Sequence, residues 1–361
     1  MKRFPFLDWM RGLAIVVMIQ THTFNSFTRM DLREGGLYVL SQFVGGMAAP
    51  LFLFMSGMTL AFQMESLERR EQHRWRRWLV SLRRGIYILA IAFAFRLTNW
   101  AASLPHADAH DLTKVDILNC MGVGLMALSV GAVLDAKGRA RFAAAAGFAI
   151  AAAAPLVSAM PWNHVPSMVR EYLAPASVPG RFGFFPYVAY IGFGLAVGAI
   201  VKSIAADRFE RVIEWAMLIG LALVFTGQYF ANFPYSLYSN ASFWIDGPAL
   251  TVIRAGISLL LMAGAYLWTE YCVGPGWSWM QCLGRNSLMV YWVHFSLVYG
   301  YPAERLQRVL SIPQTGLATG GVILLMVALS AAWLRWKARR AERWKAATTV
   351  AGGDVQPLKA Y

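Results

Sequence analysis

The chain has 361 residues, of which 58% are hydrophobic and only 14% are charged. Soluble globular proteins carry about a quarter charged residues, so this composition excludes an ordinary soluble domain and predicts a polytopic membrane protein. The net charge of +14 does not indicate a nucleic-acid partner, because the Lys and Arg residues lie between hydrophobic segments rather than on one face or arm. Their position favours cytoplasmic loops that face anionic membrane lipids.

Ten apolar segments follow one another along the chain, each long enough to cross about 30 Å of hydrocarbon. The predicted spans are 9–28, 43–63, 80–100, 115–135, 140–160, 184–203, 210–231, 248–269, 280–300 and 315–335. An even number of spans places the clusters of Lys and Arg on one side, which the positive-inside rule identifies as the cytoplasm. We therefore predict an all-α bundle in the inner or plasma membrane, with both termini cytoplasmic. It comprises one transmembrane domain over residues 1–340 and a disordered tail over 341–361.

The first span contains ionisable side chains that cost roughly 3 kcal/mol each at bilayer depth. Asp8, Arg11, His22 and Asn25 fall on one flank of a helix, and Arg11 and His22 are separated by roughly 16 Å along its axis. Asp8 and Arg11 have two interpretations, an interfacial ion pair or part of a functional stripe. His22 is either a buried histidine with satisfied hydrogen bonds or a group for proton transfer near neutral pH.

The ninth span carries a second histidine deep in the membrane. Ser287, Tyr291 and His294 recur at i, i+4 and i+7 and share one helix face. They form either a cluster of hydrogen bonds between helices or a substrate site. Further polar candidates in or near spans are Arg96, Asp116, Asn119 and Arg254, where Arg96 and Asp116 can equally be a structural ion pair.

A basic segment from Arg74 to Arg84 precedes the third span and includes two tryptophans. It is either a positive-inside anchor or a site for a phosphate-rich cytoplasmic ligand, since guanidinium groups bind phosphate in a bidentate manner. The sequence predicts no metal site, because the three cysteines lack metal-type spacing. It also contains no Gly-rich phosphate loop.

Five motifs in order resemble the transmembrane acyltransferase superfamily, and within it the heparan-alpha-glucosaminide N-acetyltransferase-like bacterial proteins and, more distantly, the acyltransferase-3 family. The first is Phe6-Leu7-Asp8-Trp9-Met10-Arg11-Gly12-Leu13-Ala14, followed by His22. The others are residues 49–57, residues 116–122, Phe185-Pro186-Tyr187 with residues 192–198, and residues 284–294. Together they extend over nearly the whole chain.

The resemblance implies an integral membrane O- or N-acyltransferase that moves an acetyl or short acyl group from cytoplasmic acyl-CoA, with acetyl-CoA as co-substrate. The acceptor would be a sugar hydroxyl or amine of a glycan or amino sugar on the far side of the membrane. The resemblance assigns catalysis to His22, Asp8 and Arg11, and contacts with acyl-CoA to Arg83 and Arg84. From the residues themselves we add Asn25 and His294 as catalytic candidates and Arg11 and Arg77 as further contacts of the acyl-CoA phosphates. The candidates for binding the acceptor are Ser287, Tyr291, Asp116, Asn119 and Arg254.

Two other functions compete with this interpretation. A transporter or flippase for a small polar or glycan-linked solute would also use Arg, Asp and His within the membrane, although no internal repeat supports it. A silent structural protein would leave the stripe from Arg11 to His22 without a role. The sequence fixes neither the acceptor, nor whether His22 is a general base or an acylated relay, nor whether the chain forms a homo-oligomer.

Overall fold

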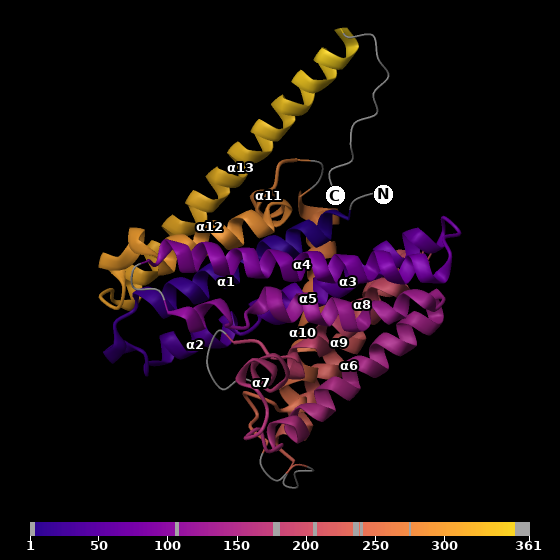
Figure 1. Ribbon diagram of the computed structural model, residues 1–361, viewed down its shortest axis with the longest axis horizontal. Helices are drawn as coiled ribbons and strands as arrows, with labels where there is room; N and C mark the ends of the chain where they lie inside the picture. The colour runs from indigo at the N-terminus through magenta and orange to yellow at the C-terminus, as the bar shows by residue number, and fades with distance from the viewer. Residues whose placement is uncertain are drawn as a thin grey trace.

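The computed structural model describes residues 4–104, 108–175, 181–204, 208–233, 238, 241–273 and 276–350. Within these ranges the regular elements are helices (Figure 1). The α-helices are α1 (Pro5–Phe27), α2 (Gly36–Gly45), α3 (Ala48–Glu68), α4 (Arg74–Ala102), α5 (Ile117–Leu128), α6 (Ala136–Ser158), α7 (Ser167–Leu173), α8 (Phe184–Ser203), α9 (Phe209–Ala231), α10 (Pro248–Leu267), α11 (Trp279–Arg285), α12 (Ser287–Tyr299) and α13 (Ile312–Val350).

The predicted all-α membrane fold is confirmed in its architecture. Every predicted span overlaps helical residues. The second, 43–63, includes the end of α2 and most of α3, and the eighth, 248–269, begins with α10 and continues into a π-helical turn. Among the described residues, six helical stretches are long and apolar enough to cross a membrane: 36–68, 74–102, 136–158, 184–203, 248–273 and 312–343. Two further apolar stretches, 117–133 and 287–299, are shorter. The count of ten spans and the cytoplasmic placement of both termini stay predictions.

The ninth predicted span is not one helix but two, α11 and α12, which meet at Asn286. The Asn286 amide donates to the carbonyls of Cys282 at 3.1 Å and of Ser330 at 3.3 Å, so it satisfies backbone groups on α11 and α13 at the break. Gly284 lies just before the break, where an added Cβ would be 1.8 Å from the Asp8 carbonyl oxygen. The lack of a side chain there allows α11 to pack directly on α1.

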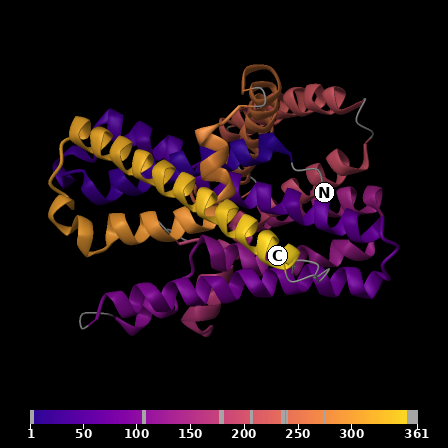
Figure 2. The same cartoon turned by 90° about the horizontal axis from the view of Figure 1, so that it is seen from above.

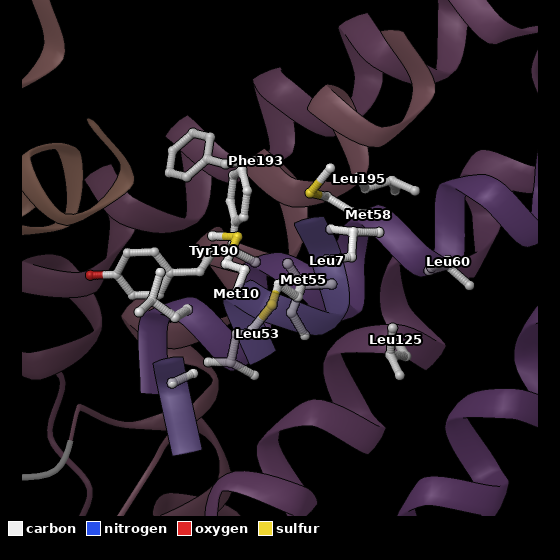
Figure 3. Packing of buried hydrophobic residues seen from close by; sticks show 14 of the residues in the cluster. Leu7, Met10, Leu53, Met55, Met58, Leu60, Leu125, Tyr190, Phe193 and Leu195 are labelled. Atoms are coloured by element: carbon white, nitrogen blue, oxygen red, sulfur yellow. The ribbon is translucent and has the colours of Figure 1, made fainter. Parts of the chain in front are cut away.

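A core of buried apolar side chains joins α1, α3, α5 and α8 (Figure 3). The labelled residues come from α1 (Leu7 and Met10), from α3 (Leu53 to Leu60), from α5 (Leu125) and from α8 (Tyr190 to Leu195). Glycine again sets the distance between helices, because a Cβ on Gly194 of α8 would lie 1.8 Å from the Phe54 carbonyl oxygen of α3. Close backbone approach through small residues is how membrane helices gain packing without a hydrophobic driving force.

The last helix, α13, has 39 residues and leaves the bundle at an angle, so that its C-terminal half projects from the other helices (Figures 1 and 2). Its first half is attached to α1 through buried hydroxyls, with Thr23 and Thr319 only 2.6 Å apart. The helix continues to Val350, ten residues beyond the predicted end of the domain at 340. The rest of the predicted tail, residues 351–361, lies outside the described residues.

Candidate active site

Two histidines that are 272 positions apart in sequence meet between α1 and α12. His22 Nδ1 lies 2.9 Å from His294 Nε2, and the two rings are stacked at 5.1 Å between centroids. His294 is fully buried, whereas His22 is partly exposed. The structure therefore places the fully buried imidazole of His294 directly against the less buried imidazole of His22.

The hydrogen bonds fix the tautomer of both rings. His294 Nδ1 is 2.7 Å from the Val290 carbonyl oxygen, which can only accept, so Nδ1 of His294 carries a proton. In the neutral ring its Nε2 is then an acceptor, and the Nδ1–H of His22 must be the donor to it. Neutral His22 consequently has its lone pair on Nε2, which is the atom left for chemistry.

Aromatic rings and one amide complete the surroundings of His22. Phe295 and Tyr299 pack edge-on against its ring at 5.8 and 5.5 Å between centroids. Asn25, one helical turn further along α1, accepts a hydrogen bond from the Tyr38 hydroxyl at 2.8 Å through its Oδ1. Asn25 thus lies near the histidine pair, as the sequence stripe predicts, and fastens α2 to α1.

At the other end of α1, Asp8 lies between two arginines. Its Oδ1 is 3.4 Å from Arg11 Nη1, and its Oδ2 is 3.3 Å from Arg285 Nε at the end of α11. Asp8 is buried, and Arg11 remains partly exposed. Gly12 next to Arg11 belongs to the same contact, because an added Cβ would lie 2.0 Å from the Met280 carbonyl oxygen. The Asp-Arg-Gly signature therefore builds the α1–α11 junction.

Arg84 of α4 adds a further cation to this end of α1. Its guanidinium donates to neutral acceptors, the Thr59 hydroxyl at 2.7 Å and the side-chain Oε1 of Gln63 at 3.1 Å. The charge that acts on it is that of Arg11, another cation. Arg11, Arg84 and Arg285 therefore lie at the same end of α1 as the carboxylate of Asp8. Arg83, the next residue in the predicted phosphate site, is exposed.

Arg77, also predicted to hold acyl-CoA, belongs to a different cluster. It is buried, lies 3.2 Å from Glu68 Oε2, and donates to the Leu134 carbonyl at 2.6 Å. The same Glu68 and its neighbour Glu65 pair with the fully buried Arg139 at 2.5 and 3.3 Å. This four-residue network joins α3, α4 and α6, and it occupies the guanidinium of Arg77.

Asp116 and Asn119 form the start of α5. Asp116 accepts the backbone N–H groups of Leu118 and Asn119 at 2.9 and 3.1 Å, and the Asn119 side chain accepts the N–H of Asp116 in return. This reciprocal capping box satisfies the free donors of a helix N-terminus. Asp116 also lies 3.2 Å from Arg96, as the structural interpretation of that pair anticipates.

Asn119 also donates to the hydroxyl of Tyr172 on α7 at 2.9 Å. Burial raises the pKa of that Tyr172 hydroxyl, so it stays protonated near neutral pH. The polar groups of Asp116 and Asn119 are thus engaged in fastening α5 to α4 and α7.

The remaining predicted residues separate into two places. Tyr291 is buried, with its ring 6.0 Å from that of His294, so the predicted face of α12 does lead to the histidine pair. Ser287 is the first residue of α12, at the end of that helix remote from His294. Arg254 lies on α10 in a separate cavity.

Sequence reasoning missed three contributors to these sites. Arg285 is the second partner of Asp8. Its position inside the 284–294 motif was the feature of the sequence that could have identified it. Tyr38 and Tyr299 reach Asn25 and His22 from segments that no motif singled out.

The chain also matches a known protein family. Residues 3–239, more than half of the chain, match the family model described as heparan-alpha-glucosaminide N-acetyltransferase, catalytic. This range contains His22, Asp8, Arg11 and Arg84, while His294 and Arg285 lie beyond it. Among curated proteins, none matches the chain. The match confirms the family expected from the motifs, and the chain belongs to the heparan-alpha-glucosaminide N-acetyltransferase family of membrane acyltransferases.

Proposed function

We propose that the protein transfers an acetyl group from cytoplasmic acetyl-CoA to an amine or hydroxyl of a sugar on the extracytoplasmic side, with His22 as the reacting base. The observation that carries this proposal is the histidine pair, which leaves Nε2 of a partly exposed His22 without a proton. An activated base backed by an orienting group is the arrangement that acyl transfer requires.

In the proposed reaction the acceptor nitrogen or oxygen attacks the thioester carbonyl carbon, and His22 Nε2 takes the proton that the acceptor loses. The bond between carbon and sulfur breaks, and the same proton passes to the departing CoA sulfur. While His22 is protonated, its Nδ1–H bond to His294 strengthens, because a hydrogen bond from a charged donor is roughly twice as strong as a neutral one.

His22 Nε2 has the same lone pair available as a nucleophile. In that variant the acetyl group first moves to His22 with release of CoA thiol, and the acceptor then takes it from the imidazole. The two routes differ in one observable, since only the second releases a stoichiometric burst of thiol before acceptor is added.

The donor phosphates are proposed to bind at the guanidinium groups of Arg11 and Arg84, with Arg83 at the exposed rim. Among the described residues, the hydrogen-bond partners of Arg84 are neutral, so a phosphate would supply a counter-ion. A pantetheine arm is long enough to reach along α1 from Arg11 toward His22, roughly 16 Å away. Arg77 is left out of this proposal because Glu68 occupies it.

The deciding experiment measures thiol release from acetyl-CoA by the protein purified in detergent, with and without amino sugars and glycans. We expect release by the wild type and at least a hundredfold slower release by His22→Ala, which is the lower end of general acid–base contributions. Arg84→Ala should raise the KM for acetyl-CoA with little change in kcat, and Arg305→Ala, on an exposed turn, serves as its matched control. If the folded wild-type protein neither binds acetyl-CoA nor releases thiol with any acceptor, the proposed transferase function is wrong and a transporter or flippase is favoured.

A further inference from the structure

A cavity of about 320 Å³ opens between α9, α10 and the junction of α2 with α3, apart from the histidine pair. Its lining combines one cation, Arg254, with the amides Gln228 and Asn232 and with large apolar or aromatic side chains such as Phe43 and Trp244. A site of this composition is typical of ligand pockets, which are mostly apolar with a few polar groups that fix orientation.

The charge of Arg254 has no counter-ion among the described residues. The phenol groups of Tyr187 and Tyr190 interact with its guanidinium, and both are neutral partners. Asp246, the acid nearest to it in sequence, accepts the backbone N–H of Ser242 at 2.7 Å instead. Because a cation within a membrane-spanning helix costs roughly 3 kcal/mol, an anionic ligand would supply the compensation that the protein omits.

The backbone makes room for this guanidinium. Gly46 lies beside it, and a Cβ at that position would be 2.8 Å from Arg254 Nη2. The preceding Gly45 packs on Thr21 of α1, where an added Cβ would be 2.0 Å from the Thr21 hydroxyl oxygen. Thr21 directly precedes His22, so the cavity lies in the same half of the bundle as the histidine pair, beyond α2.

The cavity also borders an exposed surface of aromatic side chains. Two of its aromatic lining residues, Phe43 and Trp244, are 55% and 61% exposed and pack edge-on at 6.3 Å. On α9, Phe225 and Tyr229 continue this exposed aromatic surface at 69% and 63%. A ligand that enters here meets apolar rings first and the guanidinium further in.

We propose that the Arg254 cavity binds the phosphate of a membrane amphiphile, with the phosphate on Arg254 and the apolar chain leaving past Phe43 and Trp244. A guanidinium pairs with phosphate through two parallel hydrogen bonds, which suits a site with one cation and several amide groups. Two sources share this chemistry, a phospholipid of the bilayer and a lipid-linked sugar phosphate. Binding of either ligand in this cavity does not depend on the acetyl transfer proposed above.

The test titrates delipidated protein, without acetyl-CoA, with phosphatidylglycerol, a polyprenyl-phosphate sugar and diacylglycerol, which has the chains but no phosphate. Binding is followed by native mass spectrometry and by the rise in unfolding temperature. Arg254→Gln should weaken binding of at least one phosphate amphiphile by roughly tenfold, the effect of losing one charge-assisted pair. Arg305→Gln, which removes an exposed cation, is the matched control and should bind as the wild type does.

Ala231→Trp provides a second variant, because it fills the cavity while it keeps Arg254. We expect it to block the same amphiphile, which keeps the proposal testable if Arg254→Gln fails to fold. The amphiphile that binds more tightly identifies the source. The proposal is overturned if both variants bind as the wild type does, if diacylglycerol binds equally well, or if inorganic phosphate alone competes at the same concentration. None of these results bears on thiol release that depends on His22, so the two proposals fail separately.

Discussion

Replacing His294 tests the role of the histidine pair most directly. His294 touches His22 through one hydrogen bond of 2.9 Å and is itself fully buried. In His294→Ala the Nδ1–H of His22 loses its acceptor, and the charge that develops on His22 during transfer loses its stabilising partner. In the proposed mechanism His294 is a positioning residue, so we expect its effect in the rate rather than in donor binding.

The size of the effect follows from the kind of bond that is lost. A hydrogen bond to a charged group contributes about 1.5–3 kcal/mol, which corresponds to a decrease in kcat of roughly 10- to 150-fold. Loss of the fixed tautomer adds a few-fold at most, because an unpartnered imidazole still populates both forms. We expect kcat of His294→Ala to fall by about two orders of magnitude, with the KM for acetyl-CoA within about twofold of wild type.

The conservative variant His294→Gln separates positioning from packing. A glutamine carbonyl oxygen can accept the Nδ1–H of His22 from about the position of the lost Nε2, so this variant should recover a substantial part of the rate. The assay is steady-state thiol release, with unfolding temperature measured for each variant in the same detergent. Activity of His294→Ala within about twofold of wild type, or equal loss in the alanine and glutamine variants at unchanged stability, would refute the reasoning.

The remaining predictions concern stability and the donor route. Gly284→Ala should lower the unfolding temperature strongly, because its Cβ would overlap the Asp8 carbonyl oxygen at 1.8 Å, whereas Gly316→Ala, with open space around it, should be tolerated; equal stability of the two would contradict the close α1–α11 packing. Arg139→Ala removes the buried partner of Glu65 and one of the two buried partners of Glu68, and it should cost about 3–5 kcal/mol in denaturant unfolding, against little for the exposed Arg343→Ala. A thiol burst equal to the enzyme concentration before acceptor is added would identify the acyl-histidine route, and its absence would identify direct transfer.

The family assignment and the architecture were accessible from the sequence because both depend on local patterns. Apolar length decides which segments can cross a bilayer, and each predicted span overlaps helical residues. Five motifs in order, the first of which contains Asp8 and Arg11, indicated the family that the comparison confirms. Helix periodicity also placed Asn25 on the flank of His22, where the structure has it in contact with Tyr38.

Other features depend on contacts between distant segments. The basic segment 74–84 predicted Arg77 and Arg84 together as phosphate ligands. Only the packing of α3, α4 and α6 shows that Arg77 pairs with Glu68, while Arg84 has neutral partners. The break at Asn286 could likewise not be predicted from the sequence, because the 280–300 segment is apolar enough to be one continuous helix. Hydropathy predicts whether a segment can lie in lipid. It does not predict which backbone carbonyl on another helix a side-chain amide will contact.

The sequence by itself determined that the chain is a helical membrane protein, because a helix must be apolar over about 20 residues to cross the hydrocarbon. It also located the ionisable groups of the first and ninth spans, because charged side chains are rare in such segments. Only the tertiary structure decided that the two histidines share one hydrogen bond and that Val290 fixes both tautomers. These atoms are brought together by the packing of α1 on α11 and α12, which Gly12 and Gly284 allow at the α1–α11 contact, and that packing is a property of the assembled bundle rather than of either helix alone.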